Sequence, residues 1–127
     1  MKILLVDDAP AMRDILKKIL AHLPGATFVE AADGIQACAA LASPGGAVDL
    51  CLVDWNMPNM DGLAFVRLVR AANRSLPIIM VATEAEKARV VEAIKAGVNN
   101  YVCKPYTPKI LLDKVTQTLA RQKAAAA

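Results

Sequence analysis

The sequence predicts an α/β protein, a doubly wound parallel sheet of five strands in the (βα)5 arrangement. Five short apolar runs alternate along the chain with five longer stretches in which apolar residues recur at helical spacing. The short runs are continuously apolar, as in strands that helices cover on both faces. For five such units we expect the strand order 2-1-3-4-5, with a ligand site beyond the carboxyl ends of the strands.

The strands and helices are expected in strict alternation. The expected strands cover residues 3–6, 27–31, 50–53, 78–81 and 101–103, and the expected helices cover residues 11–23, 34–42, 62–72, 84–96 and 107–121. The first, third and fifth strands each end directly before a charged side chain. Their carboxyl ends are therefore the places to look for chemistry.

Most of the helices have a start or stop signal. Gly25 stops the first helix, the run Ser43-Pro44-Gly45-Gly46 stops the second, and Gly97 stops the fourth. The third helix shows apolar residues at helical spacing between Leu63 and Val69. The last helix opens with Thr107 as N-cap and Pro108 at the first helical position.

Length and composition fit one globular domain. The chain has 127 residues, of which 56% are hydrophobic, enough to bury a core. We expect the domain to cover residues 1–121, with 122–127 as a frayed tail. No apolar segment approaches the length of a membrane span. The apolar run at the N-terminus is too short for a secretory signal, and two acidic residues follow it. A cytoplasmic location is therefore expected. We also expect a monomer, although the sequence does not determine the oligomeric state.

Cysteine and charge patterns exclude other classes of site. The three cysteines show no metal-binding spacing and are expected to be reduced core thiols. The net charge is +3, but the basic residues are scattered and aromatic residues make up only 4% of the chain. A nucleic-acid surface needs a basic patch, preferably with stacking rings, so no nucleic-acid partner is expected.

Charged side chains gather at the strand ends. Asp7 and Asp8 follow the first strand, Asp54 the third and Lys104 the fifth. The first and third strands are neighbours in the predicted order, so three carboxylates converge, which is unfavourable unless a cation or protonation offsets their charge. Any one of these acids alone is better explained as a turn residue. The set together with Lys104 predicts a site for Mg²⁺, which prefers oxygen ligands.

Such a site has a specific chemical use. A carboxylate beside Mg²⁺ and a lysine can attack phosphorus and form an aspartyl phosphate. The metal ion and Lys104 would offset the charge on the transferring group. The residues alone therefore predict phosphoryl transfer to an aspartate.

Four segments resemble the receiver domains of two-component response regulators: ILLVDD (3–8), DWNMPNMDG (54–62), PIIMV (77–81) and KAGVNNYVCKP (95–105). The resemblance spans Lys2 to about Leu119, and the full set in this order is highly specific. It implies the same flavodoxin-like architecture as the element pattern. Within the family, the chain most resembles the single-domain chemotaxis regulators.

The resemblance implies a role for each residue of the site. Asp54 is the phosphoacceptor, Lys104 contacts the phosphoryl group, and the Lys104-Pro105 bond is cis. Tyr101 is the switch aromatic, which turns inward on activation. The implied Mg²⁺ ligands are the side chains of Asp8 and Asp54 and the main-chain carbonyl of Asn56, with Asp7 holding a metal-bound water.

The sequence departs from the family at one position. The family places Ser or Thr at the end of the fourth strand, where this chain has Ala82. Thr83 is a poor substitute, because a shift of one residue along a strand turns the side chain to the other face. Thr83-Glu84-Ala85-Glu86 also matches a helix capping box. We expect phosphorylation of Asp54 to persist, with weakened coupling to Tyr101.

The implied partners are a histidine kinase, which supplies the phosphoryl group, and the flagellar motor switch or another target. The target would bind the face made by the fourth helix, fifth strand and last helix. The only reactions that the chain would catalyse are its own phosphorylation and dephosphorylation, and both only weakly. It is therefore not expected to be an enzyme in the usual sense.

Other functions remain open. A degenerate receiver would act as an interaction module without phosphorylation, and a phosphate sink or relay receiver would carry the same site outside chemotaxis. A flavin carrier is disfavoured because Asp7-Asp8 would repel a phosphate tail. An aspartyl phosphatase would need a second acid where this chain has Asn56.

Overall fold

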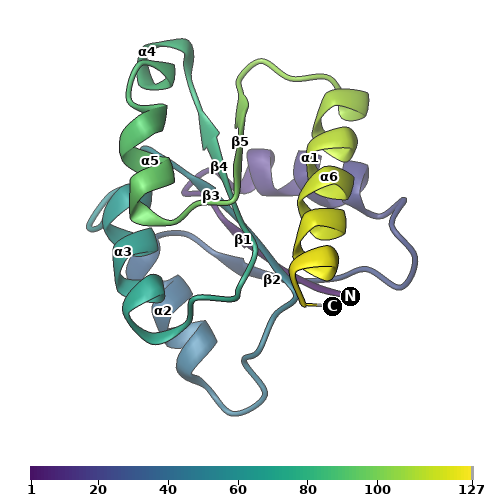
Figure 1. Ribbon diagram of the computed structural model, residues 1–127, viewed down its shortest axis with the longest axis horizontal. Helices are drawn as coiled ribbons and strands as arrows, with labels where there is room; N and C mark the ends of the chain where they lie inside the picture. The colour runs from purple at the N-terminus through teal and green to yellow at the C-terminus, as the bar shows by residue number, and fades with distance from the viewer. Residues whose placement is uncertain (127) are drawn as a thin grey trace.

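The computed structural model describes residues 1–126 and shows a single parallel sheet with the order β2-β1-β3-β4-β5. The predicted fold class and strand order are confirmed (Figure 1). The strands are β1 (Lys2–Val6), β2 (Thr27–Ala31), β3 (Leu50–Asp54), β4 (Ile78–Ala82) and β5 (Asn100–Cys103). The helices are α1 (Pro10–Leu20), α2 (Gly34–Ala42), α3 (Gly62–Ala72), α4 (Glu84–Lys87), α5 (Val90–Ala96) and α6 (Pro108–Ala126).

Helices cover the sheet on both faces, and each face has its own core. One core, which we call the α1/α6 layer, contains Ile3 and Leu5 of β1 and Leu52 of β3, packed against α1 and α6. The other, the α2/α3/α5 layer, contains Leu4 and Val6 of β1, packed against α2, α3 and α5. Figure 1 shows the two sets of helices on opposite sides of the sheet. Successive strand residues thus enter opposite layers, as the pleat requires.

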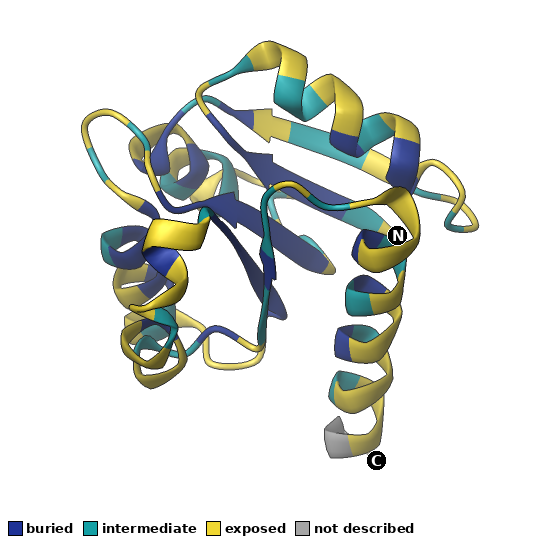
Figure 2. Cartoon of the chain, turned by 90° about the horizontal axis from the view of Figure 1, so that it is seen from above, coloured by how far each residue is buried: buried dark blue, intermediate teal, exposed yellow. Residues whose placement is uncertain are grey.

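The central strands are fully enclosed by these layers. Every residue of β3 and β4 is buried, whereas the edge strand β2 is buried only at Ala31. Figure 2 shows the same contrast between the buried sheet and the exposed outer sides of the helices. Cys51 lies in this core, Cys38 and Cys103 are half-buried, and all three thiols are free, as expected. Within residues 1–126, no helix is long and apolar enough to cross a membrane.

Side chains cap the first turns of four helices. Asp33 Oδ1 and Asp61 Oδ1 accept hydrogen bonds from the first turns of α2 and α3, each at 2.8 Å. Thr83 and Glu86 form the expected capping box of α4. Thr107 Oγ1 accepts a hydrogen bond from the Ile110 amide at 3.1 Å, so its expected role at the start of α6 is confirmed.

Three of the expected helices differ from the prediction by more than one residue. The first helix ends at Leu20 rather than at residue 23, because Pro24 disfavours the helical conformation at Leu23. The helix expected over 84–96 is broken at Ala88 and Arg89, where the Arg89 amide bonds to Glu86, three residues back. The last helix continues beyond Arg121 to Ala126, through most of the expected tail. Residue 127 of that tail lies outside the described residues.

Candidate functional site

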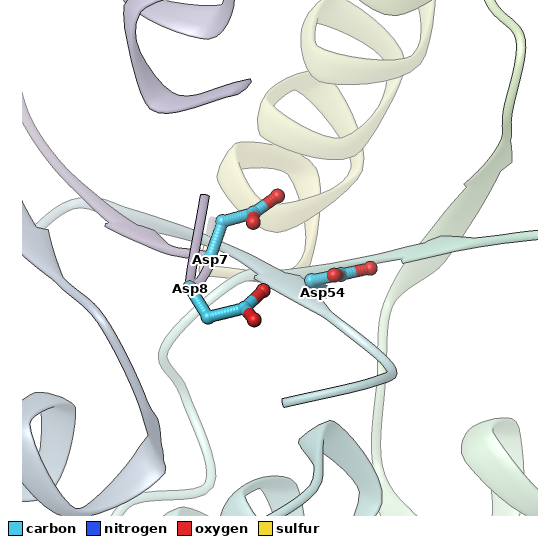
Figure 3. A group of neighbouring side chains, drawn as sticks. All are labelled: Asp7, Asp8 and Asp54. Atoms are coloured by element: carbon cyan, nitrogen blue, oxygen red, sulfur yellow. The ribbon is translucent and has the colours of Figure 1, made fainter. Parts of the chain in front are cut away.

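Three carboxylates meet at the carboxyl ends of β1 and β3. Asp7, Asp8 and Asp54 each offer an oxygen within 4.8 Å of the other two. Figure 3 shows the three side chains close together, with the Asp8 carboxylate directed toward Asp54. Asp7 and Asp54 are buried and Asp8 is exposed, so the cluster opens to solvent on the Asp8 side. The predicted convergence of the three acids is confirmed.

The alternation of the strands explains which side chains share this edge. Leu5 and Leu52 enter the α1/α6 layer, and two residues later Asp7 and Asp54 follow on the same side. The Asp7 amide still bonds to the Ala31 carbonyl at 3.1 Å, so the ladder of β1 continues through this residue. The cluster is thus a direct consequence of strand register.

Lys104 faces the cluster from β5. Its Nζ lies 3.1 Å from Asp54 Oδ1, and its amide bonds to the Ala82 carbonyl, which continues the pairing of β4 and β5. The Lys104-Pro105 peptide bond is cis, as the family resemblance implied. An ammonium group and three carboxylates therefore share one site.

The electrostatics of the site favour binding of a cation. Burial raises the pKa of Asp7, although hydrogen bonding from the Ala9 amide and the charge of Lys104 lower it. Burial also raises the pKa of Asp54, opposed by the hydrogen bond from Lys104, while the charges of Asp7 and Glu86 add to the increase. Burial thus makes both carboxylates costly to ionise even with Lys104 beside them, and a bound cation would offset that cost.

A hard divalent cation fits this set of donors. Three carboxylate oxygens lie within 4.8 Å of one another, and oxygen-only sites of this kind suit Mg²⁺, which keeps several of its waters. The exposure of Asp8 leaves room for such waters. Asn56, whose main-chain carbonyl is the expected additional ligand, lies two residues after Asp54 in the loop that follows β3.

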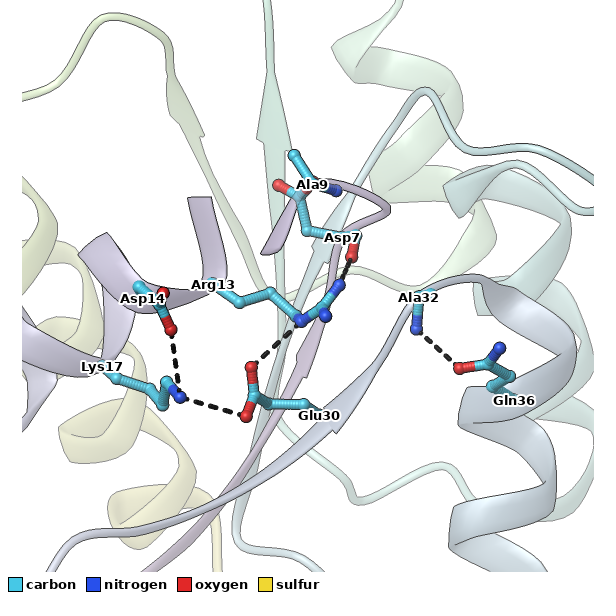
Figure 4. Close-up of polar contacts among 8 residues, drawn as sticks. All are labelled: Asp7, Ala9, Arg13, Asp14, Lys17, Glu30, Ala32 and Gln36. Atoms are coloured by element: carbon cyan, nitrogen blue, oxygen red, sulfur yellow. Dashed lines mark hydrogen bonds and ion pairs between the residues drawn. The ribbon is translucent and has the colours of Figure 1, made fainter. Parts of the chain in front are cut away.

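The loop that carries Asp7 and Asp8 is held by α1. Arg13 Nη1 donates to the Asp7 carbonyl at 2.5 Å, and Arg13 Nε lies 3.0 Å from Glu30 of β2. Lys17 pairs with the other oxygen of Glu30 and with Asp14 (Figure 4). The Asp7 carboxylate itself accepts from the Ala9 amide at 2.9 Å. Asp7 is therefore held by hydrogen bonds to both its main-chain carbonyl and its side-chain carboxylate.

The loop after Asp54 requires a glycine at its end. A Cβ atom on Gly62 would clash with the Asp54 carbonyl, and the Gly62 amide bonds to the Trp55 carbonyl at 2.8 Å. Asn59, at a positive φ of 68°, donates to Asp33 Oδ2 at 2.9 Å and so ties the loop to α2. The close approach of Gly62 to the end of β3 thus leaves no room for a side chain at this position.

Two contacts to this loop were not predicted from the sequence. Asn56 Nδ2 donates to Glu86 Oε2, and Glu86 Oε1 accepts from the Thr83 amide at 2.8 Å. The guanidinium of Arg89 lies 4.9 Å from the centroid of the Trp55 ring. We call these two contacts the loop clamp, because they join residues 55 and 56 to α4 and the turn that follows it. Only the capping-box pattern of Glu86 hinted at them.

Ala82 and Tyr101 share the α2/α3/α5 layer of the core. Ala82 is fully buried in the α2/α3/α5 layer, and Tyr101 packs against the same layer, half-buried, with Lys114 Nζ 5.1 Å from its ring centroid. The Thr83 hydroxyl accepts from the Glu86 amide at 3.4 Å. Thr83 is thus engaged in the expected capping box of α4.

Comparisons with known proteins agree with this geometry. The family model described as response regulator receiver domain matches residues 3–116. The chain is 46% identical over 121 residues to chemotaxis protein CheY1 of Helicobacter pylori strain J99, covering 94% of this chain and 97% of that one. It is 44% identical to chemotaxis protein CheY of Pseudomonas aeruginosa, covering 95% and 98%.

Solved structures show the same architecture. A CheY-like response regulator receiver domain protein from Methanospirillum hungatei superposes with a TM-score of 0.87 at 29% identity, covering 98% of this chain and 97% of that one. The Francisella response regulator 1452 receiver domain gives a TM-score of 0.82 at 25% identity, covering 94% and 97%.

Proposed function

This chain belongs to the response regulator receiver domain family, and on that premise we propose that it is a CheY-type chemotaxis regulator that accepts a phosphoryl group on Asp54. The observation that carries the proposal is the contact of 3.1 Å between Lys104 Nζ and Asp54 Oδ1 beside the Asp7–Asp8 pair. The 46% identity to a chemotaxis protein supports the same biological role.

The proposed reaction is a displacement at phosphorus. An oxygen of Asp54 forms a bond to the phosphorus of a kinase phosphohistidine, while the phosphorus–nitrogen bond breaks and the imidazole leaves with the electron pair. Asp54 is buried, which limits the access of water to the reacting phosphorus, and Lys104 is placed to offset the negative charge of the phosphoryl oxygens. Mg²⁺ held by Asp8, Asp54 and Asn56, with Asp7 through water, would neutralise the charge of the transferring group.

A direct test is a mass measurement. Incubation with a small acyl phosphate and Mg²⁺ is expected to add the mass of one phosphoryl group to the chain. The gain should disappear without Mg²⁺ and in Asp54→Asn, which keeps the shape of the side chain but lacks the nucleophilic carboxylate. An unchanged mass in the presence of Mg²⁺ would contradict phosphoacceptance and favour an interaction module that works without phosphorylation.

The proposed output face is made by α4, α5, β5 and α6. Val91 and Ile94 of α5 are 61% and 55% exposed, and Ile110 of α6 is 47% exposed. Exposed apolar side chains of this kind suit a protein partner. We propose the flagellar motor switch as the target and a cytoplasmic histidine kinase as the phosphoryl donor. A sink or relay receiver would use the same acids, and a failure to bind the switch after phosphorylation would favour that role.

Ala82 is proposed to weaken the coupling between Asp54 and Tyr101. It lies in the layer that holds Tyr101, yet offers no hydroxyl to a phosphoryl group. Restoring the hydroxyl with Ala82→Thr is expected to increase the change in the Tyr101 ring signals, measured by NMR, when the acyl phosphate is added. Ala82→Val is the matched control, because it adds similar volume to a fully buried site without a hydroxyl. Equal responses in the parent chain and in Ala82→Thr would refute weakened coupling.

A further inference from the structure

Tyr106 carries a buried hydroxyl that the proposed mechanism does not use. Among the residues whose side chains the structure describes, its Oη is the one buried side-chain nitrogen or oxygen without a hydrogen-bond partner. The ring packs against the α1/α6 layer. A buried donor without an acceptor costs free energy, so a site that retains one calls for an explanation.

The hydroxyl lies on the side of the sheet that carries the acids. Asp7 and Asp54 follow strand residues of the α1/α6 layer, and Tyr106 packs against that same layer. It lines a cavity of about 370 Å³ together with Lys104, Pro105 and two residues of α1, Met12 and Ile15. Because Lys104 Nζ contacts Asp54, this cavity adjoins the site. Ala82 and Tyr101, by contrast, face the other layer.

The electrostatics define the hydroxyl as a donor. Burial raises the pKa of Tyr106, and the negative charges of Asp7 and Asp54 raise it further. A phenol hydroxyl can donate a hydrogen bond, and the carboxylates of Asp7 and Asp54 are acceptors. The hydrogen bond found on the Asp7 carboxylate goes to Oδ1, from the Ala9 amide.

We propose that Tyr106 is a positioning residue of the cation site, whose hydroxyl donates to the Asp7 carboxylate when a divalent cation is bound. The inference rests on the proposed function, because it assumes that the three carboxylates hold Mg²⁺. Without a counter-ion the carboxylates repel one another, whereas a bound cation draws them together and fixes their orientation. A second donor on Asp7 then holds the carboxylate that carries a metal-bound water.

The test is Tyr106→Phe, which removes one oxygen and keeps the ring. Mg²⁺ affinity, measured by isothermal titration calorimetry, is expected to fall about 10-fold, the lower end of the usual effect of losing a group that orients a metal ligand. The melting temperature without Mg²⁺ should rise or stay the same, because a buried hydroxyl without a partner has been removed. The increase in melting temperature on saturation with Mg²⁺ should be smaller than in the parent chain.

Met12→Leu is the matched control, since it alters the packing of the same cavity without touching the hydroxyl. Its Mg²⁺ affinity should match that of the parent. If Tyr106→Phe binds Mg²⁺ as tightly as the parent, or if Met12→Leu weakens binding equally, the positioning role is wrong. That outcome is distinct from failure of the proposed function, in which the parent chain itself would bind no Mg²⁺ and gain no mass.

Discussion

At the scale of single residues, Asp7 shows the conflict between stability and function most clearly. It is 3% exposed, lies beside two other acids, and has a pKa raised chiefly by burial. An acid whose pKa is higher in the folded chain than in the unfolded chain destabilises the fold when it ionises. The charge is useful only when a cation offsets it.

We therefore expect Asp7→Asn to increase the free energy of unfolding at pH 7 without Mg²⁺, by about 1 kcal/mol, the order of one like-charge interaction at short range in water. With saturating Mg²⁺ the parent chain should have the larger free energy of unfolding, because the cation stabilises it more than it stabilises Asp7→Asn. The pH dependence of this effect follows from the raised pKa values of Asp7 and Asp54 in the folded chain. Their ionisation destabilises the fold at neutral pH, and this destabilisation is lost as the pH falls through the folded pKa values toward the ordinary value of 3.8.

Urea denaturation at pH 7 and pH 5 measures this effect, and the advantage of Asp7→Asn should be smaller at pH 5. Asp113→Asn is a suitable control, because Asp113 is exposed on α6 and pairs only with Lys109 at the surface. A loss of stability in Asp7→Asn without Mg²⁺ would show that the favourable interactions of the negative charge with Lys104 and the Ala9 amide outweigh burial and repulsion.

The residues that sequence reasoning found and missed differ in a physical way. Asp7, Asp8, Asp54 and Lys104 follow strands directly, so their convergence depends only on strand order, which the alternation of elements predicts. The roles of Glu86 and Arg89 depend on how a loop folds over its neighbour. Hydrophobic periodicity carries no information on such contacts.

At the scale of elements, the sheet was predicted well because a buried strand is a short apolar run bounded by polar residues. The ends of the helices were harder to predict, because they depend on the conformational preferences of single residues. Pro24 ends α1 through its effect on the preceding residue, a signal that was present but was assigned to Gly25. The break between α4 and α5 has no such signal, because Ala88 and Arg89 both favour helix.

That break coincides with the loop clamp. Glu86, in the last full turn before the break, holds Asn56, and Arg89, at the break, lies over Trp55 while pairing with Glu92 at 3.0 Å. The element between β4 and β5 is thus attached to the phosphoacceptor loop at two points.

At the scale of the whole molecule, the final helix closes the α1/α6 layer with residues that all precede Arg121. Leu111, Val115 and Thr118 are buried. Thr118 Oγ1 donates to the Lys114 carbonyl at 2.7 Å and accepts from Asn100 Nδ2 at 3.2 Å, which joins α6 to β5. The helix continues to Ala126, but Arg121, Lys123 and Ala124 are exposed. The helix is therefore longer than the part of it that the core needs.

This difference predicts where the domain ends. A chain that stops at Arg121 should lose no more than about 0.5 kcal/mol of unfolding free energy, although it loses the hydrogen bond from Gln122 to the Ser75 carbonyl, because that contact is exposed. A chain that stops at residue 116, the end of the family match, also loses Thr118 and the half-buried Leu119 and should lose about 2 kcal/mol or more. Urea denaturation of the two truncated chains beside the full chain separates these values. If removal of residues 122–127 alone costs as much as the longer truncation, the last helical turn belongs to the folded domain.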